Sequence, residues 1–183
     1  VLKPLPNEVQ FSPVFGTLAN DFNADGFLDV LLVGNSESFE TYTGPYNASL
    51  GTLMLGNGNG GFTYVPQSNS GLYLDYDQKA LGMVNAGNEN LFVVTNNNAP
   101  VQLLRTSVAS NGEFISLQAN EASLEMILDN GKAERKEIGY GSGYLTQSSR
   151  GILASTKSVK QINVYDFVGN QTRTIKTKPH EPN

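Results

Sequence analysis

Short runs of aliphatic and aromatic residues alternate along the chain with clusters of glycine, asparagine and proline. Each run has the length of a β-strand, and the Val, Ile, Phe and Tyr that fill these runs favour strands. The predicted strands are 28–34, 52–57, 61–67, 90–96, 101–107, 112–119, 123–129 and 159–167. Only ALGMV at 80–84 could be argued as helical, and it is too short for a stable helix. The pattern therefore predicts an all-β fold.

Asparagine-glycine pairs mark the places where hairpins are expected to turn. Both residues tolerate the positive φ that tight two-residue loops demand. The pairs are Asn57-Gly58, Asn59-Gly60, Asn111-Gly112 and Asn130-Gly131. We therefore expect the strands on either side of each turn to pair antiparallel.

Two stretches repeat one order of elements, which is strand, connection, strand, glycine-rich turn and strand. LDVLLVG followed by TLMLGNGNGGFTYV overlays on LFVVTNN followed by VQLLRTSVASNGEFI. The first copy has a longer connection, at 36–49, which predicts a surface loop. Its aromatic residues Phe39, Tyr42 and Tyr46 either form a recognition surface or fold the loop over themselves.

Charge and composition remove several classes of function. The chain of 183 residues has 12 Lys and Arg against 17 Asp and Glu, a formal charge of −5, so the basic footprint of a nucleic-acid-binding protein is absent. The longest apolar stretch, around 30–33, is far shorter than the roughly 20 residues that cross a bilayer. Cysteine is absent, which excludes disulfides and thiolate chemistry.

The stretch DFNADGFLD at 21–29 places three carboxylates and an amide at alternate positions around a glycine. Close anions repel one another, so such a loop is stable mainly when a cation lies among them. Gly26 allows a sharp bend that turns oxygen atoms inward, and Phe22 and Leu28 face the other way to pin the loop to a core. Hard oxygen ligands at this spacing are typical of Ca²⁺ rather than Mg²⁺. The predicted ligands of one structural Ca²⁺ are Asp21, Asn23, Asp25, the carbonyl of Phe27, and Asp29.

The alternative is an asparagine- and aspartate-rich turn that caps backbone amides without a metal, although such a turn has no evident use for Asp25 and Asp29. A helix-loop-helix calcium site is excluded because the twelfth position of the loop is Leu32, inside a predicted strand. The second copy has no acidic residue at the equivalent positions, which predicts a single site.

The run GTLANDFNADGFLDVLLVGN resembles the FG-GAP or VCBS repeat, the blade unit of integrin-α-like β-propellers. The second copy, ending VVTNNNAPVQLLR, resembles a further repeat with a degenerate loop. The resemblance covers 14–106 and implies four-stranded antiparallel blades, with calcium in the D-x-[DN]-x-D-G-x-x-D loop. Two copies cannot close a ring, because propellers need at least four blades.

A second resemblance follows in the chain. RKEIGYGSGYLTQSSRGI at 135–152 is similar to the ASPIC/UnbV domain, which follows FG-GAP repeats in secreted and surface proteins. The chain departs from that family in ILAST and in DFVGN at 166–170. The implied organisation is two partial propeller-type repeats at 1–106, not a closed ring, packed with a C-terminal β domain at 107–178, then a disordered tail at 179–183.

The candidate catalytic groups are few. The single histidine, His180, lies in the predicted tail, which argues against a Ser-His-Asp relay and against a histidine zinc site. Asp75 and Asp77 are expected on one side of a strand, where a carboxylate pair is more often a solvated face than a glycosidase site. GNGNGG and GYGSGY lack the Lys-Ser/Thr of a phosphate-binding loop and are interpreted as turns. The chain is therefore predicted not to be an enzyme.

The expected function is a calcium-binding adhesion or interaction module, extracellular or on the cell surface, with a protein or glycan ligand. The chain opens VLKPLPNEVQ, without Met or a signal peptide, so it is expected to be a C-terminal piece of a longer repeat protein. The alternative is a glycan-binding accessory domain of a carbohydrate-active or nutrient-uptake protein, with contacts through Tyr42, Tyr46, Tyr73 and Tyr76.

Overall fold

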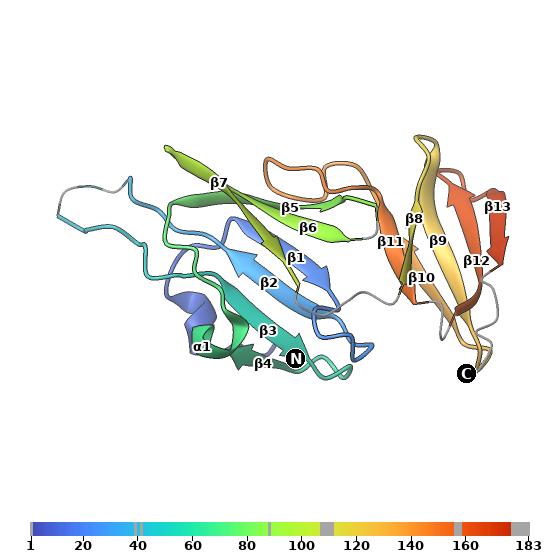
Figure 1. Cartoon of the computed structure of the whole chain (residues 1–183), viewed down its shortest axis with the longest axis horizontal. Coiled ribbons are helices and arrows are strands. Elements are labelled where there is room, and N and C mark those ends of the chain that lie inside the picture. Colours follow the sequence, from blue (N-terminus) through green and yellow to red (C-terminus); the bar gives the residue numbers. More distant parts are fainter. Residues whose placement is uncertain are drawn as a thin grey trace. The chain divides into compact units, whose positions relative to one another are not determined.

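The chain is all-β, as predicted, and its four antiparallel sheets are not closed into a barrel in the part that the structure covers (Figure 1). The computed structural model describes residues 2–38, 40, 42–87, 89–106, 112–155 and 159–176. Phe39, Asn111, His180 and the predicted tail lie outside these residues. None of the helices in the described ranges is long and apolar enough to cross a membrane.

The chain forms two compact units. Unit 1 contains Val1–Val84, Asn90–Val108 and Gly143–Ser148, and unit 2 contains Asn85–Glu89, Ala109–Ser142 and Ser149–Asn183. Gly143–Ser148 thus lies in unit 1, although the sequence places it in the C-terminal segment. There the Ser148 hydroxyl accepts a hydrogen bond from the Met83 amide at 3.0 Å, and the Tyr144 ring lies 6.0 Å from that of Phe15.

The first sheet of unit 1 follows the chain order without a crossover. Its strands are β1 (Gly16–Asn20), β2 (Asp29–Val33), β3 (Thr52–Gly56) and β4 (Phe62–Val65). Each strand pairs antiparallel with the next, with Leu18 opposite Leu31 and Met54 opposite Tyr64. The hairpin predicted at Asn57–Gly60 connects β3 to β4, so that prediction is confirmed.

The second sheet of unit 1 supplies the other half of its core. It consists of β5 (Gln78–Asn85), β6 (Asn90–Asn96) and β7 (Ala99–Arg105), in that order. Because side chains alternate between the faces of a strand, one face of each sheet is apolar and the two faces pack together. The buried core of unit 1 is Leu18, Leu31, Val33, Leu74, Leu81, Phe92 and Val94.

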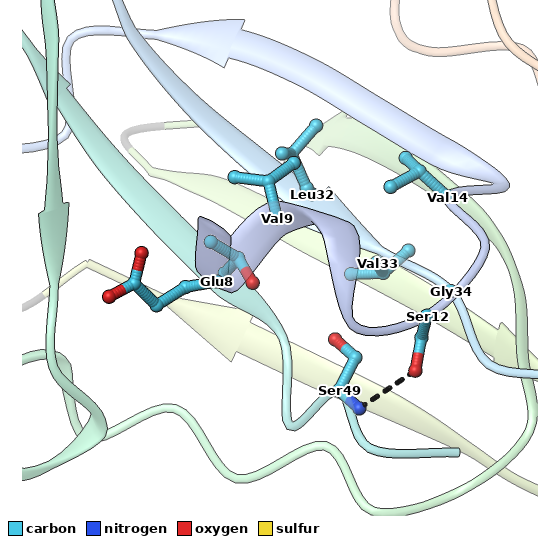
Figure 2. Close-up of a pocket in the computed structure, with 9 residues that line it drawn as sticks. Glu8, Val9, Ser12, Val14, Leu32, Val33, Gly34 and Ser49 are labelled. Atoms are coloured by element: carbon cyan, nitrogen blue, oxygen red, sulfur yellow. Dashed lines mark hydrogen bonds between the residues drawn. The ribbon is translucent and has the colours of Figure 1, made fainter. Parts of the chain in front are cut away.

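The N-terminal segment covers part of the first sheet. It contains the 3-10 helix η1 (Asn7–Gln10). Elsewhere in unit 1, a short helix α1 (Gln67–Ser70) follows β4. Figure 2 shows Val9 and Val14 of this segment beside Leu32 and Val33 of β2, around a small pocket. The Ser12 hydroxyl accepts a hydrogen bond from the Ser49 amide at 3.1 Å. This pocket is lined by the aliphatic side chains of Val9, Val14, Leu32 and Val33, by the polar side chains of Glu8, Ser12, Ser49 and Thr52, and by Gly34.

Unit 2 contains a four-stranded sheet and a two-stranded one. The larger sheet has the order β10 (Ala133–Glu137), β9 (Glu121–Leu128), β12 (Val159–Asp166), β13 (Gln171–Lys176). β8 (Gly112–Ser116) pairs with β11 (Gly151–Ser155). The buried core is Ile115, Leu117, Leu124, Met126, Ile152, Ala154, Val159, Ile162 and Val164. The turn predicted at Asn130-Gly131 connects β9 to β10 and is confirmed.

Some sequence predictions of strands and turns were wrong. The sequence missed β1, β5, β10, β11 and β13, and ALGMV, the one helical candidate, lies inside β5. The turn predicted at Asn111-Gly112 lies partly outside the described residues, and the strands before and after it, β7 and β8, pair with β6 and β11. The second copy of the repeat therefore gives a three-stranded sheet, and the counterpart of β4 pairs elsewhere.

Candidate functional site

The acidic loop, defined as 21–29, connects β1 to β2 and reverses the chain at one end of the first sheet. Gly26 has φ +92°, which is the bend that the sequence predicts there. Ala24 also has a positive φ, +60°, a conformation that a non-glycine residue adopts only when its surroundings hold it. The fold of this loop is therefore specified by interactions rather than by intrinsic preference.

Three side chains of the loop bind its own backbone. The Asp21 carboxylate accepts hydrogen bonds from the amides of Asp25 and Gly26 at 3.2 and 2.9 Å. Asn23 Oδ1 accepts from the Asp25 amide at 3.0 Å, and Asp25 Oδ1 accepts from the Phe27 amide at 2.8 Å. Asn23 Nδ2 donates to Asp25 Oδ2 at 2.8 Å. Each of these oxygens has a second lone pair, so the hard donors that Ca²⁺ prefers are still available.

Asp29 has a different role from the other acidic residues of the loop. Its side chain is fully buried, and its two oxygens accept hydrogen bonds from the amides of Phe22 and Gly56, both at 2.9 Å. Asp29 therefore fastens the loop both to its own start and to the end of β3. Each of its oxygens accepts one hydrogen bond and keeps a second lone pair.

The argument that a metal-free turn has no use for Asp25 and Asp29 is wrong, because both side chains accept backbone hydrogen bonds. In the part of the chain that the structure covers, no three or more Asp, Glu, His or Cys side chains are grouped so that they could hold a metal ion. The oxygen atoms of Asp21, Asn23, Asp25, the Phe27 carbonyl and Asp29 are of the type that Ca²⁺ prefers. The calcium site stays a prediction.

The acidic loop packs against the β3–β4 hairpin. The Phe27 ring lies against Gly58, and an added Cβ on Gly56 would come within 2.1 Å of the Leu28 carbonyl oxygen. Phe22 packs into the core with its ring centre 5.0 Å from that of Phe92, as predicted. Leu28 does not pin the loop as predicted, since 51% of its surface is exposed. Its backbone makes the close contact instead.

The tyrosines of the glycan alternative all have substantial exposure. Tyr42 is the most exposed, and the others are Tyr46, Tyr73 and Tyr76. Tyr42 and Tyr46 belong to the long connection, whose ends are held together by the backbone pairing of Ser36 with Tyr46. The fully buried Asn35 side chain donates to the carbonyls of Ser49 and Tyr76 and accepts from the Ser49 amide. The base of this loop is therefore fixed.

The expectation that Asp75 and Asp77 lie on one side of a strand is wrong. Neither residue is in a strand, and Asp75 is exposed whereas Asp77 is buried. Asp77 forms an ion pair with Lys79 at 2.6 Å and accepts a hydrogen bond from the Asn97 side chain at 3.1 Å. Lys79 also donates to the Asn35 carbonyl, so this carboxylate has a structural role.

Unit 2 contains an ion pair that the sequence did not indicate. Glu121 is 1% exposed, and it accepts hydrogen bonds from Arg173, from the Thr172 hydroxyl and from the Gln118 amide. Burial raises the pKa of Glu121, but these hydrogen bonds and the charge of Arg173 outweigh it, so the net shift is downward. Glu121 lies in β9 and Arg173 in β13, so the two residues are far apart in the sequence and no local spacing predicts the pair.

A cluster of exposed aromatic residues in unit 2 was also missed. The rings of Tyr140 and Phe167 are 6.3 Å apart and tilted by 15°, and the Arg150 guanidinium lies 4.0 Å from the Tyr140 ring. The available signal was DFVGN, a turn sequence with two large apolar residues at positions that are usually polar.

No family model matches the chain, and a search of curated proteins found no match either. The resemblances to FG-GAP/VCBS repeats and to the ASPIC/UnbV domain therefore stay predictions.

Proposed function

We propose that the chain is a non-enzymatic binding module, extracellular or on the cell surface, whose acidic loop binds one structural Ca²⁺. The observation that carries the proposal is the arrangement of Asp21, Asn23 and Asp25, which place five side-chain oxygens along one short bend. The resemblance to FG-GAP/VCBS repeats supports both the ion and the location. We assign no catalytic role to Asp75 and Asp77, the carboxylate pair considered from the sequence, since Asp75 is exposed and Asp77 is buried.

The ion would be held by Asp21, Asn23, Asp25 and the Phe27 carbonyl, with water completing the six to eight oxygens that Ca²⁺ takes. It would offset the repulsion between the carboxylates of Asp21 and Asp25, which are both at least partly exposed. Because the folded loop alone presents these oxygens together, binding would stabilise the fold by mass action. Asp29 would support the site as a clamp on the loop backbone.

Thermal unfolding in EDTA and in millimolar Ca²⁺ tests the proposal. Binding at a hundredfold excess over the dissociation constant adds about 2.7 kcal/mol, which for a chain of this size raises the midpoint by several degrees. Asp25→Asn keeps an acceptor for the Phe27 amide but removes the charge, so it should abolish the rise. Asp75→Asn, an exposed carboxylate in another loop, is the matched control and should leave the rise unchanged. Equal midpoints in EDTA and Ca²⁺ for the unmodified chain would refute the proposal.

The second candidate function is glycan binding, which the exposure of Tyr42, Tyr46, Tyr73 and Tyr76 favours. Aromatic faces bury the apolar C–H faces of sugar rings, and the fixed base of the 36–49 loop lowers the entropy lost on binding. A glycan array followed by Tyr46→Ala tests this candidate. Binding that survives this substitution and Tyr42→Ala would show that the loop is not the contact surface.

A further inference from the structure

We infer that Tyr140 and Phe167 of unit 2 form a platform for the sugar rings of a neutral glycan. This inference rests on the second candidate function, glycan binding, and places the ligand away from the tyrosines that the sequence indicates. It is independent of the calcium proposal.

The two rings are nearly parallel and lie close together. They are 15° from parallel with centres 6.3 Å apart, and the Arg150 guanidinium lies 4.0 Å from the Tyr140 centre and 5.9 Å from that of Phe167. These three distances place the guanidinium to one side of the pair and not between the rings. Both rings are more than half exposed, so a ligand can reach them from solvent.

The platform is exposed and held in place. Tyr140 and Phe167 are 57% and 60% exposed, and the next residue, Val168, is 85% exposed. The Tyr140 hydroxyl donates to the Ala119 carbonyl at 3.0 Å. Phe167 and Val168 lie in a tight turn in which the Asp166 carboxylate accepts from the amides of Val168 and Asn170. A ligand would therefore meet rings that are already ordered, which lowers the entropy lost on binding.

The charged groups at the platform are already engaged, which points to a neutral ligand. Arg150 donates through Nη1 and Nη2 to the carbonyls of Gln118, Glu121 and Ile138, so these N–H groups face the backbone. The Asp166 carboxylate also accepts from the Asn170 side chain at 3.0 Å. The chain as a whole carries a formal charge of −5, which disfavours an anionic partner.

The neighbouring polar groups suit hydroxyls. Gln118 and Asn120, both exposed, lie on either side of Ala119, whose carbonyl holds Tyr140. A side-chain amide both donates and accepts, as a sugar hydroxyl does. An exposed pair of nearly parallel aromatic rings beside uncharged amides matches a pyranose, which has an apolar C–H face and a rim of hydroxyls. A proline-rich peptide would instead need a groove between aromatic side chains.

Screening of the whole chain against an array of neutral and anionic oligosaccharides, followed by calorimetric titration of the strongest neutral one, tests the inference. Phe167→Ala should weaken binding at least about tenfold, because exposed aromatic anchors dominate such surfaces. Tyr140→Phe keeps the ring and should bind within about twofold of the unmodified chain. Phe11→Ala removes an exposed aromatic ring of unit 1 that belongs to neither candidate glycan surface and should have no effect. Circular dichroism of each variant confirms that it is folded.

EDTA should leave this binding unchanged, which separates the inference from the calcium proposal. Absence of any neutral glycan that binds would overturn the inference, as would full affinity in Phe167→Ala. Loss of binding in Tyr42→Ala or Tyr46→Ala but not in Phe167→Ala would support glycan binding and refute this platform. Capture of proline-rich peptides by the platform in place of glycans would also refute it.

Discussion

The buried carboxylate of Asp29 accepts a hydrogen bond from the backbone amide of Gly56 at 2.9 Å, and so joins the start of β2 to the end of β3. Its other oxygen accepts from Phe22, inside the acidic loop. Two turns that are separate in the sequence, the acidic loop and the β3–β4 hairpin, are thereby fixed to one another. The position of Asp21, Asn23 and Asp25 thus depends on Asp29.

Replacement of Asp29 should destabilise unit 1 strongly. Asp29→Ala leaves two buried amides, of Phe22 and Gly56, without an acceptor, and we expect a loss of roughly 2–4 kcal/mol in the free energy of unfolding. Urea unfolding followed by near-ultraviolet circular dichroism measures it. Asp25→Ala, at the exposed tip of the loop, is the control and should cost less than about 1 kcal/mol in EDTA. A loss for Asp29→Ala no larger than for Asp25→Ala would contradict the clamp.

Gly56 should be more sensitive to substitution than other glycines of the same turn region. A Cβ at Gly56 would come within 2.1 Å of the Leu28 carbonyl oxygen, a backbone atom that can move only with the loop. Gly60 has φ +77° and open space around it, so Gly60→Ala should cost only the strain of that conformation, about 1 kcal/mol. We expect Gly56→Ala to cost at least about 2 kcal/mol. Similar unfolding midpoints for the two variants would argue against the close approach.

The stability of unit 2 should fall in acid because of Glu121. The pKa of Glu121 is lowered in the folded chain from an ordinary value of 4.5, so its contribution is complete above that pH. It is lost as the pH falls through the folded-state pKa, since protonation removes the ion pair with Arg173. Urea unfolding between pH 3 and 7, roughly the range over which carboxylates titrate, measures the slope.

Glu121→Gln keeps the size of the side chain and cannot ionise, so its stability should depend less steeply on pH over the same range. Glu137→Gln, in the exposed part of edge strand β10, serves as the matched control and should keep the slope of the unmodified chain. Equal slopes for Glu121→Gln and the unmodified chain would assign the acid sensitivity to other groups.

The sequence predicted all the central strands of the described sheets, and every described strand that it missed lies at the edge of a sheet. β2, β6, β9 and β12 carry aliphatic runs because they are covered by core on at least one face. β10, with the sequence AERKE, and β13, with QTRTIK, are the edges of their sheet and have mostly polar side chains. Edge strands are kept polar because apolar edges aggregate. Their pairing is determined by the neighbouring strand, which a local pattern does not show.

The candidate sites also differ in how far the sequence alone could predict them. The acidic loop is local in sequence, so its bend at Gly26 and its alternating oxygens could be predicted from spacing alone. The role of Asp29 depends on Gly56, which the fold brings into contact from another turn. The platform also depends on distant segments, because Tyr140, Arg150 and Phe167 belong to three separate parts of the chain. Spacing can show local chemistry but not such contacts.

The base of the long 36–49 loop should depend on Asn35 far more than on the loop's own aromatic residues. The Asn35 amide is fully buried and bonds with Ser49 and the Tyr76 carbonyl, so Asn35→Ala removes three hydrogen bonds from the base of the loop. We expect a loss of roughly 2–3 kcal/mol in the free energy of unfolding, measured by urea titration. Tyr42→Ala is the control, since Tyr42 is 84% exposed and should change stability by less than about 0.5 kcal/mol. Because Asn35 holds the base of the loop and Tyr42 does not, hydrogen exchange at the Ser49 amide should accelerate only in Asn35→Ala. Acceleration in Tyr42→Ala would show that the loop holds its own base.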